Sequence, residues 1–117
     1  MNKRNLFVIC MIFMVYQVFC TDVNPYWDGY ATVRITRVDV TQNGNCDFRV
    51  MTNNEDLFND TDEPHDPVSW AYLNESDVNY ETYVAMLSMA FMMDYDVVIH
   101  VKKVDNYAHI GYISIRK

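Results

Sequence analysis

The sequence predicts a mainly β domain with one helix, because its apolar residues alternate in most segments and follow helical spacing in only one. Alternation is clearest over residues 30–40 and 46–52, and the turn Gln42-Asn43-Gly44-Asn45 joins these segments into a hairpin. Residues 78–93 contain neither Gly nor Pro and repeat apolar residues at helical spacing. The predicted order is strand, strand, strand, helix, strand, strand.

The first strand is expected to bend, because its apolar phase changes near Thr36-Arg37. Ala31, Val33 and Ile35 share one face, whereas Val38 and Val40 fall on the other. Side chains alternate with a period of two along a strand, so such a change requires a bulge or a sharp bend.

A long loop, a short strand and the helix follow the first hairpin. Residues 53–67 hold six carboxylates and two prolines, which predicts a loop, and residues 68–73 form a short strand candidate. Ser76 or Asp77 can cap the helix. One helical stripe is expected to be buried and comprises Tyr80, Tyr83, Val84, Leu87 and Phe91; a second stripe on another face comprises Met86, Met89 and Met93.

A second hairpin closes the chain, with alternation over residues 96–104, a turn at Asp105-Asn106 and a last strand over 109–116. Five strands with a bent first strand, and a helix between the third and the fourth, make the order of an OB-fold. A ferredoxin-like sandwich is the alternative, but it needs a helix where the short Asn43-Gly44 turn stands. We therefore expect an OB-fold-like five-stranded barrel over residues 21–117.

Residues 1–20 have the pattern of a secretory signal peptide. Lys3 and Arg4 precede an apolar run over 6–16, and Val18-Phe19-Cys20 provides a cleavage region. A membrane anchor is the alternative, but a span needs about 20 apolar residues. The pattern favours a secreted protein, periplasmic or extracellular, with no membrane span in the mature chain.

Cleavage of the signal would leave 7 basic and 16 acidic residues, a formal charge of −9. Because affinity for nucleic acid depends largely on Lys and Arg that neutralise phosphates, this charge excludes nucleic acid as a partner. The cysteines leave alternatives open. Either Cys20 is retained and bridges to Cys46, or Cys46 is a buried free thiol or an intermolecular link; the buried thiol is preferred.

An aromatic segment at the start of the mature domain is the candidate glycan site, with Tyr26, Trp27 and Tyr30 beside Asp28. Pyranose C–H faces pack on aromatic rings, and carboxylates accept hydrogen bonds from hydroxyls. The alternative is that Trp27 and Tyr30 plug one end of the barrel and that Asp28 serves a turn.

The sequence contains no catalytic or metal-binding pattern. His65, His100 and His109 lack ligand spacing, the acidic loop breaks the EF-hand pattern, and no triad, phosphate loop or dinucleotide motif occurs. We therefore expect no enzyme activity, metal or cofactor. His100 alternates with core positions and is placed on the outer face of its strand. Asn59-Asp60-Thr61 and Asn74-Glu75-Ser76 match the glycosylation sequon, or are turn and cap residues.

The methionine stripe Met86, Met89 and Met93 points to assembly, because a helix that is apolar on two faces has more surface than one small barrel covers. A homo-oligomer that packs its helices together would bury the stripe. The alternative is that the methionines fill gaps in the core.

The chain resembles the B subunits of bacterial AB5 toxins of the subtilase cytotoxin and typhoid toxin type. The similarity lies in the export signal, Cys46, Asn24-Pro25-Tyr26-Trp27, Val68-Ser69-Trp70-Ala71 and the segment Val97-Val98-Ile99-His100-Val101-Lys102-Lys103. It implies an OB-fold pentamer that recognises sialylated or related glycans and delivers a separate enzymatic subunit. The family's central serine is missing from the comparable stretch, residues 26–30, so sialic-acid specificity does not follow.

Two hypotheses result. The first is an exported, non-enzymatic domain that recognises a cell-surface glycan as a toxin B-subunit-like module. The alternative is an exported OB-like structural or interaction protein that binds a protein partner.

Overall fold

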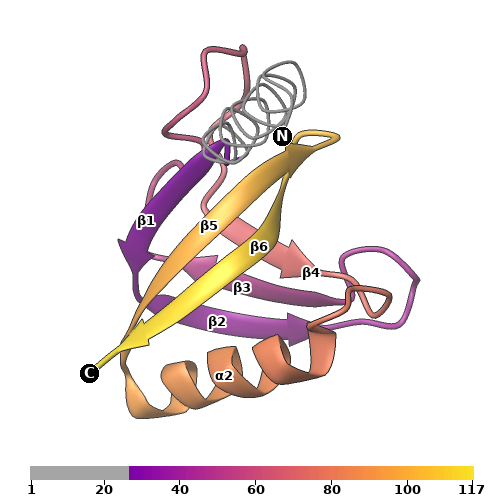
Figure 1. Ribbon diagram of the computed structural model, residues 1–117, viewed down its shortest axis with the longest axis vertical. Helices are drawn as coiled ribbons and strands as arrows, with labels where there is room; N and C mark the ends of the chain where they lie inside the picture. The colour runs from indigo at the N-terminus through magenta and orange to yellow at the C-terminus, as the bar shows by residue number, and fades with distance from the viewer. Residues whose placement is uncertain (1–26) are drawn as a thin grey trace, which may run out of the picture.

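Six strands and one helix make up the described part of the chain, residues 27–117 of a computed structural model (Figure 1). The elements are β1 (Gly29–Val33), β2 (Ile35–Val40), β3 (Phe48–Thr52), β4 (Trp70–Leu73), α2 (Tyr80–Met93), β5 (Asp96–Val104) and β6 (Tyr107–Arg116). The prediction of a mainly β domain with one helix is confirmed. The predicted signal peptide, Cys20 and Tyr26 lie outside the described residues.

All six strands belong to one sheet in the order β1-β5-β6-β4-β3-β2. Neighbouring strands are antiparallel except β4 and β6, which are parallel. The sheet is open, with β1 and β2 at its edges, so the prediction of a five-stranded barrel is wrong as to closure and strand number. The physical reason is that the first strand is divided at Arg34 and its two parts do not pair with each other.

At Arg34 the chain changes the strand with which it pairs. Val33, the last residue of β1, pairs with Val97 of β5, whereas Ile35, the first residue of β2, pairs with Thr52 of β3. β1 and β2 therefore lie at opposite edges of the sheet although only Arg34 separates them. Figure 1 shows the result, in which β1, β5 and β6 cross the direction of β2, β3 and β4 steeply.

Arg34 has hydrogen-bond partners on both its backbone and its side chain. Its N–H donates to Oδ1 of Asn53 (2.9 Å), and its carbonyl accepts from the N–H of Asn53 (3.1 Å). Its guanidinium donates from Nε to Asp96 (2.9 Å) and from Nη1 to Asp94 (2.8 Å). Asp94 is the left-handed residue that ends α2, so one side chain ties the strand break to the end of the helix.

The predicted change of apolar phase in the first strand is resolved by a bulge. Ile35 pairs with Thr52 and Arg37 pairs with Met51, which leaves Thr36 as an extra residue. The extra residue returns Val38 to the core side, where it packs partly buried against the apolar cluster. The predicted irregularity near Thr36-Arg37 is confirmed.

The helix α2 lies along β2 and also contacts β5 and β6 (Figure 1). Leu87 and Ala90 are its buried residues. The prediction that Phe91 is buried is wrong, because this side chain is 40% exposed. Ala90 and Phe91 both neighbour Leu87 on the helix surface, and the small Ala90 lets the helix approach the sheet, which leaves Phe91 at the rim.

The start of the helix also differs from the prediction. The N-cap residue is Asn79, which forms no side-chain cap bond. Asp77 does not cap the helix because its carboxylate accepts hydrogen bonds from the N–H of Asn74 (2.8 Å) and from Nε2 of His109 (2.8 Å). Ser76 is not the cap either.

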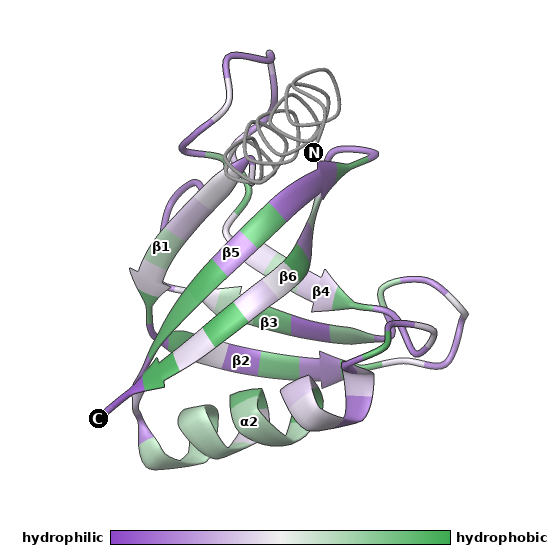
Figure 2. Cartoon of the chain, in the orientation of Figure 1, coloured by the Kyte–Doolittle hydropathy of each residue, from purple (hydrophilic) through white to green (hydrophobic). Residues whose placement is uncertain are grey.

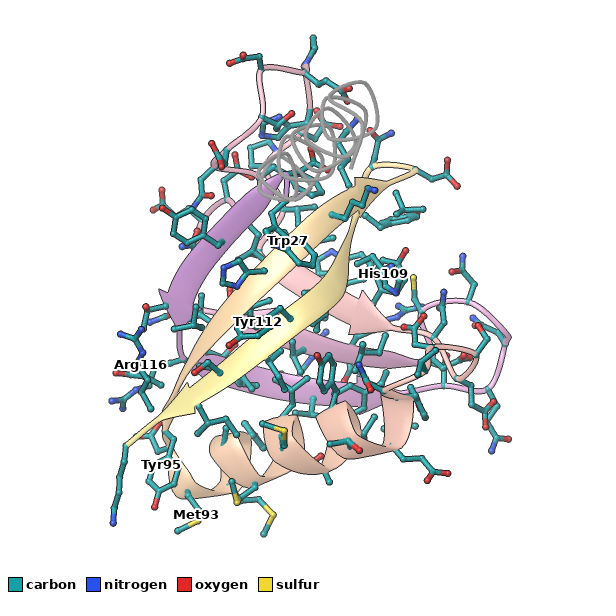
Figure 3. The ribbon with its side chains drawn as sticks, in the orientation of Figure 1. Trp27, Met93, Tyr95, His109, Tyr112 and Arg116 are labelled. Atoms are coloured by element: carbon teal, nitrogen blue, oxygen red, sulfur yellow. The ribbon has the colours of Figure 1, made fainter. Side chains whose placement is uncertain are left out.

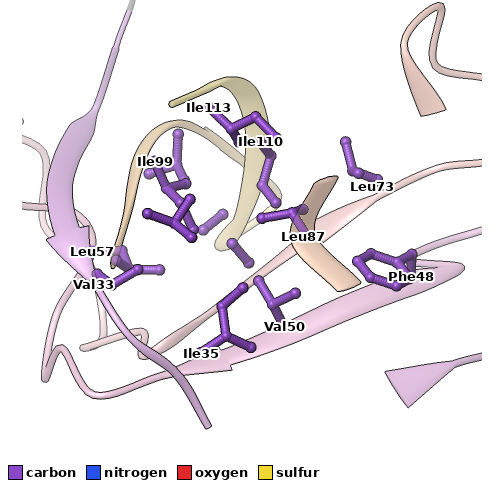
Figure 4. Packing of buried hydrophobic residues seen from close by; sticks show 14 of the residues in the cluster. Val33, Ile35, Phe48, Val50, Leu57, Leu73, Leu87, Ile99, Ile110 and Ile113 are labelled. Carbon is purple, nitrogen blue, oxygen red and sulfur yellow. The ribbon is translucent and has the colours of Figure 1, made fainter. Parts of the chain in front are cut away.

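The core fills the space between the inner face of the sheet and α2 (Figure 4). Its largest fully buried apolar side chains are Phe48, Leu57, Leu73, Leu87, Ile99, Val33, Val50, Val97 and Val101. Figure 2 shows the matching pattern, with apolar residues along the first part of β5 and over most of α2. Cys46 is buried and free among the described residues. No helix within residues 27–117 is long and apolar enough to cross a membrane.

Candidate ligand-binding site

A bulge in β6 determines which side chains reach the outer face of the sheet. Val101 pairs with Ile110 and His100 pairs with Tyr112, so Gly111 is an extra residue without a partner on β5. An extra residue shifts the alternation of every residue that follows it. Ile110 and Ile113 are both buried as a result, whereas Tyr112 points outward and is 50% exposed.

Gly111 also makes room for Trp27. A Cβ at this position would overlap Cζ3 and Cη2 of the indole ring, so the ring lies directly over the bulge. Figure 3 shows Trp27 and Tyr112 over β5 and β6. Only glycine leaves this space on the outer face, and a side chain at 111 would displace the ring.

Asp28 positions the segment that carries Trp27. Its N–H donates to the carbonyl of Val101 (2.9 Å), and its Oδ2 accepts from the N–H of Lys103 (2.6 Å). Both bonds extend the pairing of β1 with β5 beyond Gly29. The structure thus gives Asp28 a positioning role, and its predicted contact with a sugar stays a prediction.

Trp27, Tyr30 and Tyr112 surround His100. Tyr30 on β1 and Tyr112 on β6 are the cross-strand partners of His100. The ring of Tyr30 stacks on the imidazole at 5.4 Å and 16°, and the rings of Tyr112 and Trp27 meet it edge-on at 5.1 and 5.6 Å. These four residues form an aromatic platform on the outer face of β1, β5 and β6.

The imidazole of His100 has one nitrogen that is shielded from solvent. Its Nδ1 is buried and forms no hydrogen bond within the described residues. Burial lowers the pKa of His100, so the ring is neutral at neutral pH. A buried polar atom without a partner costs about 1–3 kcal/mol, and native proteins have few such atoms.

The loop over residues 53–67 borders the platform. Oδ1 of Asn59 accepts from the N–H of Tyr30 (3.0 Å), and Nδ2 of Asn59 donates to the carbonyl of Tyr30 (2.7 Å). Gly29 permits this approach, because a Cβ there would overlap the carbonyl oxygen of Leu57. The loop is therefore fixed to β1 at the residue that carries one platform ring.

His65 organises this loop from within. Its Nε2 lies 2.9 Å from Oδ2 of Asp56, and its Nδ1 lies 2.9 Å from the carbonyl oxygen of Glu63. Both neighbours are acceptors, so only the doubly protonated ring satisfies both. These two hydrogen bonds raise the pKa of His65. Burial alone would raise the pKa of Asp56, but hydrogen bonds from His65 and from the N–H groups of Phe58 and Val68 lower it.

The structure brings some of the predicted site residues together and separates others. Trp27 and Tyr30 share the platform, and Tyr26 lies outside the described residues. The sequence placed His100 correctly on the outer face but did not connect it with them, and it missed Tyr112. The signal for Tyr112 is the run Ile110-Gly111-Tyr112-Ile113, in which a glycine interrupts the alternation of two isoleucines.

The three residues of the predicted methionine stripe, Met86, Met89 and Met93, also lie in different surroundings. Met86 packs partly buried against the core. Met89 and Met93 are exposed, and so are Phe91 and Met92, which the prediction of the stripe did not include. An interface between copies of the chain stays a prediction.

No protein-family model matches the chain, and a comparison with curated proteins also finds no match. The similarity to AB5 toxin B subunits therefore rests on the residues quoted for it and stays a prediction.

Substitution of Gly111 by alanine tests the packing of Trp27 on the bulge. In a Trp70→Phe background, where Trp27 is the single indole, we expect Gly111→Ala to shift the emission of Trp27 to longer wavelength. The displaced ring should also lower the free energy of unfolding by about 1–3 kcal/mol. In a Trp27→Ala background the same substitution should cost much less. An equal cost in both backgrounds would contradict the contact.

The pairing of His65 predicts a defined pH dependence. Because the folded-state pKa is raised, the contribution of His65 to stability is complete below its ordinary pKa of about 6.5 and is lost as pH rises through the raised value. The difference in urea midpoint between the wild type and His65→Gln should therefore be larger at pH 6 than at pH 9. His100 is present in both proteins, so its own effect on the pH dependence of stability cancels when the two urea midpoints are subtracted. Equal differences at both pH values would refute the assignment.

Proposed function

We propose that the chain is an exported, non-enzymatic binding domain whose aromatic platform recognises a cell-surface glycan. The observation that carries the proposal is the exposure of Tyr30 (55%) and Tyr112 (50%) on either side of His100. Exposed aromatic rings gathered on one face of a sheet are typical of interaction surfaces. Secretion follows the predicted signal peptide and belongs to the same proposal.

The chemistry of the platform suits a sugar. Aromatic faces take the C–H face of a pyranose, while the hydroxyls of Tyr30 and Tyr112 and the indole N–H of Trp27 pair with sugar hydroxyls. The cross-strand contacts with His100 hold the rings in place before binding, which lowers the entropy lost with the ligand. Preorganisation of this kind supports ligand binding by the platform.

The charge near the platform favours a neutral glycan. The adjoining loop over residues 53–67 contains six carboxylates. Asp56 pairs with His65 and Glu63 pairs with Lys103, but the loop as a whole remains strongly acidic. Electrostatic repulsion from such a loop disfavours acidic sugars, which agrees with the missing serine noted in the sequence.

We further propose that the open sheet has an OB-like topology and that the domain is a toxin B-subunit-like module with a separate enzymatic partner. Three features support the OB assignment: the parallel pair β4 and β6, the helix between β4 and β5, and edges formed by one stretch that bends at Arg34. If β1 and β2 count as one bent strand, the element order is the predicted one. The pentamer implied by the resemblance belongs to this proposal.

Binding to an array of neutral glycans tests the platform directly. We expect Tyr30→Ala and Tyr112→Ala each to weaken binding about tenfold or more, because each removes one ring from the sugar-binding surface. Val40→Ala is the control, since Val40 is 66% exposed on β2, at the edge of the sheet opposite Tyr30, and it should leave binding unchanged. Absence of glycan binding by the wild type would refute the proposal and favour a protein partner.

The outer side of α2 favours a second function, association with a protein or with further copies of the chain. Met92 is 82% exposed, and Met89, Met93 and Phe91 are exposed beside it. Met89→Glu with Met92→Glu should abolish self-association in sedimentation equilibrium. Val78→Glu is the control, because Val78 is fully exposed before the helix begins. A wild-type protein that stays monomeric at millimolar concentration contradicts the homo-oligomer.

A further inference from the structure

A second group of aromatic residues lies on the outer face of β4 and β6. The rings of Trp70, Tyr72 and Tyr107 contact one another, with centroids 5.4 to 6.5 Å apart. His109 stacks on Tyr72 at 5.0 Å and 22°, and the guanidinium of Arg49 lies 5.5 Å from the ring of Trp70. These five residues form the β4 cluster.

The β4 cluster and the platform lie on the same face of the sheet. On β6, Tyr107 and His109 precede the bulge at Gly111 and Tyr112 follows it, and all three point away from the buried Ala108, Ile110 and Ile113. On β5, Lys102 pairs with His109, and His100 pairs with Tyr112. Trp27 covers Gly111 between the two groups, so the outer face carries one aromatic belt.

The belt is longer than a single sugar ring. Tyr30 stands on β1 and Trp70 on β4, and these strands are three positions apart in the sheet order. With neighbouring strands about 4.8 Å apart, the belt extends over about 14 Å across the strands. Because Tyr107 and Tyr112 both stand on β6, five residues apart, the belt also runs along that strand, and it fits a short chain of sugars laid diagonally across the strands.

The polar groups of the β4 cluster are held in place. Nε of Arg49 donates to the carbonyl of Cys46 (3.0 Å), and Nε2 of His109 lies 2.8 Å from the carboxylate of Asp77. Tyr72 is 3% exposed, and burial raises its pKa to about 12, so this ring supports Trp70, Tyr107 and His109 from within the cluster. Fixed polar groups between aromatic faces match a hydroxylated ligand better than a purely apolar one.

We propose that the β4 cluster is a second subsite for the glycan bound at the platform, so that the domain binds a neutral oligosaccharide across its strands. The inference rests on the proposed function of the platform. The occupant is the continuing sugar chain because the belt is continuous from Tyr30 to Trp70 and repeats the same combination of rings and polar groups. A protein partner on this face is an outcome that the test distinguishes.

The two tryptophans of the chain report on the two subsites separately. Trp70→Phe leaves Trp27 as the reporter of the platform, and Trp27→Phe leaves Trp70 as the reporter of the β4 cluster. The probes are galactose, mannose and N-acetylglucosamine, and the linear neutral tetrasaccharides built from each. We expect a monosaccharide to change only the emission of Trp27, and the matching tetrasaccharide to change the emission of both tryptophans.

Affinities from calorimetry provide a readout that does not depend on the tryptophans. The wild type should bind the tetrasaccharide about tenfold more tightly than the monosaccharide, because the second subsite contributes only to the longer chain. Tyr107→Ala should remove this advantage without changing monosaccharide affinity, and Val40→Ala should change neither.

The outcomes separate the two proposals. Equal affinities for monosaccharide and tetrasaccharide, with no response of Trp70, overturn the second subsite and leave the platform intact. No response of Trp27 to any of the six saccharides overturns both, and a protein partner then becomes the better explanation of the belt.

Discussion

The exchange of partners at Arg34 is the constraint on which the rest of the fold depends. Within three residues the chain leaves β5 and joins β3, and its two parts become the two edges of the sheet. The ion pairs of Arg34 with Asp94 and Asp96 are solvent-exposed and contribute little stability. Their effect is geometric, because they place the end of α2 against the break. The pairing of β1 with β5, and with it the position of Tyr30 beside His100, depends on where this exchange occurs.

Two bulges determine the direction of side chains on β2 and β6. Thr36 returns Val38 to the core side of β2, and Gly111 turns Tyr112 outward while Ile110 and Ile113 stay buried. The bulge in β2 therefore serves the packing of the core, and the bulge in β6 determines which side chains lie on the outer face. The glycine has a second effect, since its missing side chain admits the ring of Trp27. Gly111 thus determines both the outward direction of Tyr112 and the position of the Trp27 ring.

Much of the fold could be predicted from local patterns, because hairpins, helices and phase changes are recorded in neighbouring residues. The first hairpin, the helix and the irregularity near Thr36 are of this kind. The platform could be predicted only in part. Trp27 and Tyr30 stand out by composition, but their contacts with His100 and Gly111 depend on the register between distant strands, which no short pattern specifies. The burial of Ala90 in place of Phe91 depends on how closely α2 approaches the sheet, and the use of Asp77 by His109 depends on a strand that follows thirty residues later.

The two hydrogen bonds between Asn59 and Tyr30 have a consequence for behaviour in solution. An unpaired edge strand is a template on which another chain can add, and a sheet with exposed aromatic rings would be prone to such growth. Asn59 occupies the donor and the acceptor of Tyr30 with a side chain that cannot itself extend the sheet. The acidic loop that carries Asn59 adds repulsion between copies at the same edge. The loop thus blocks the addition of another strand at Tyr30, on the edge that carries one ring of the platform.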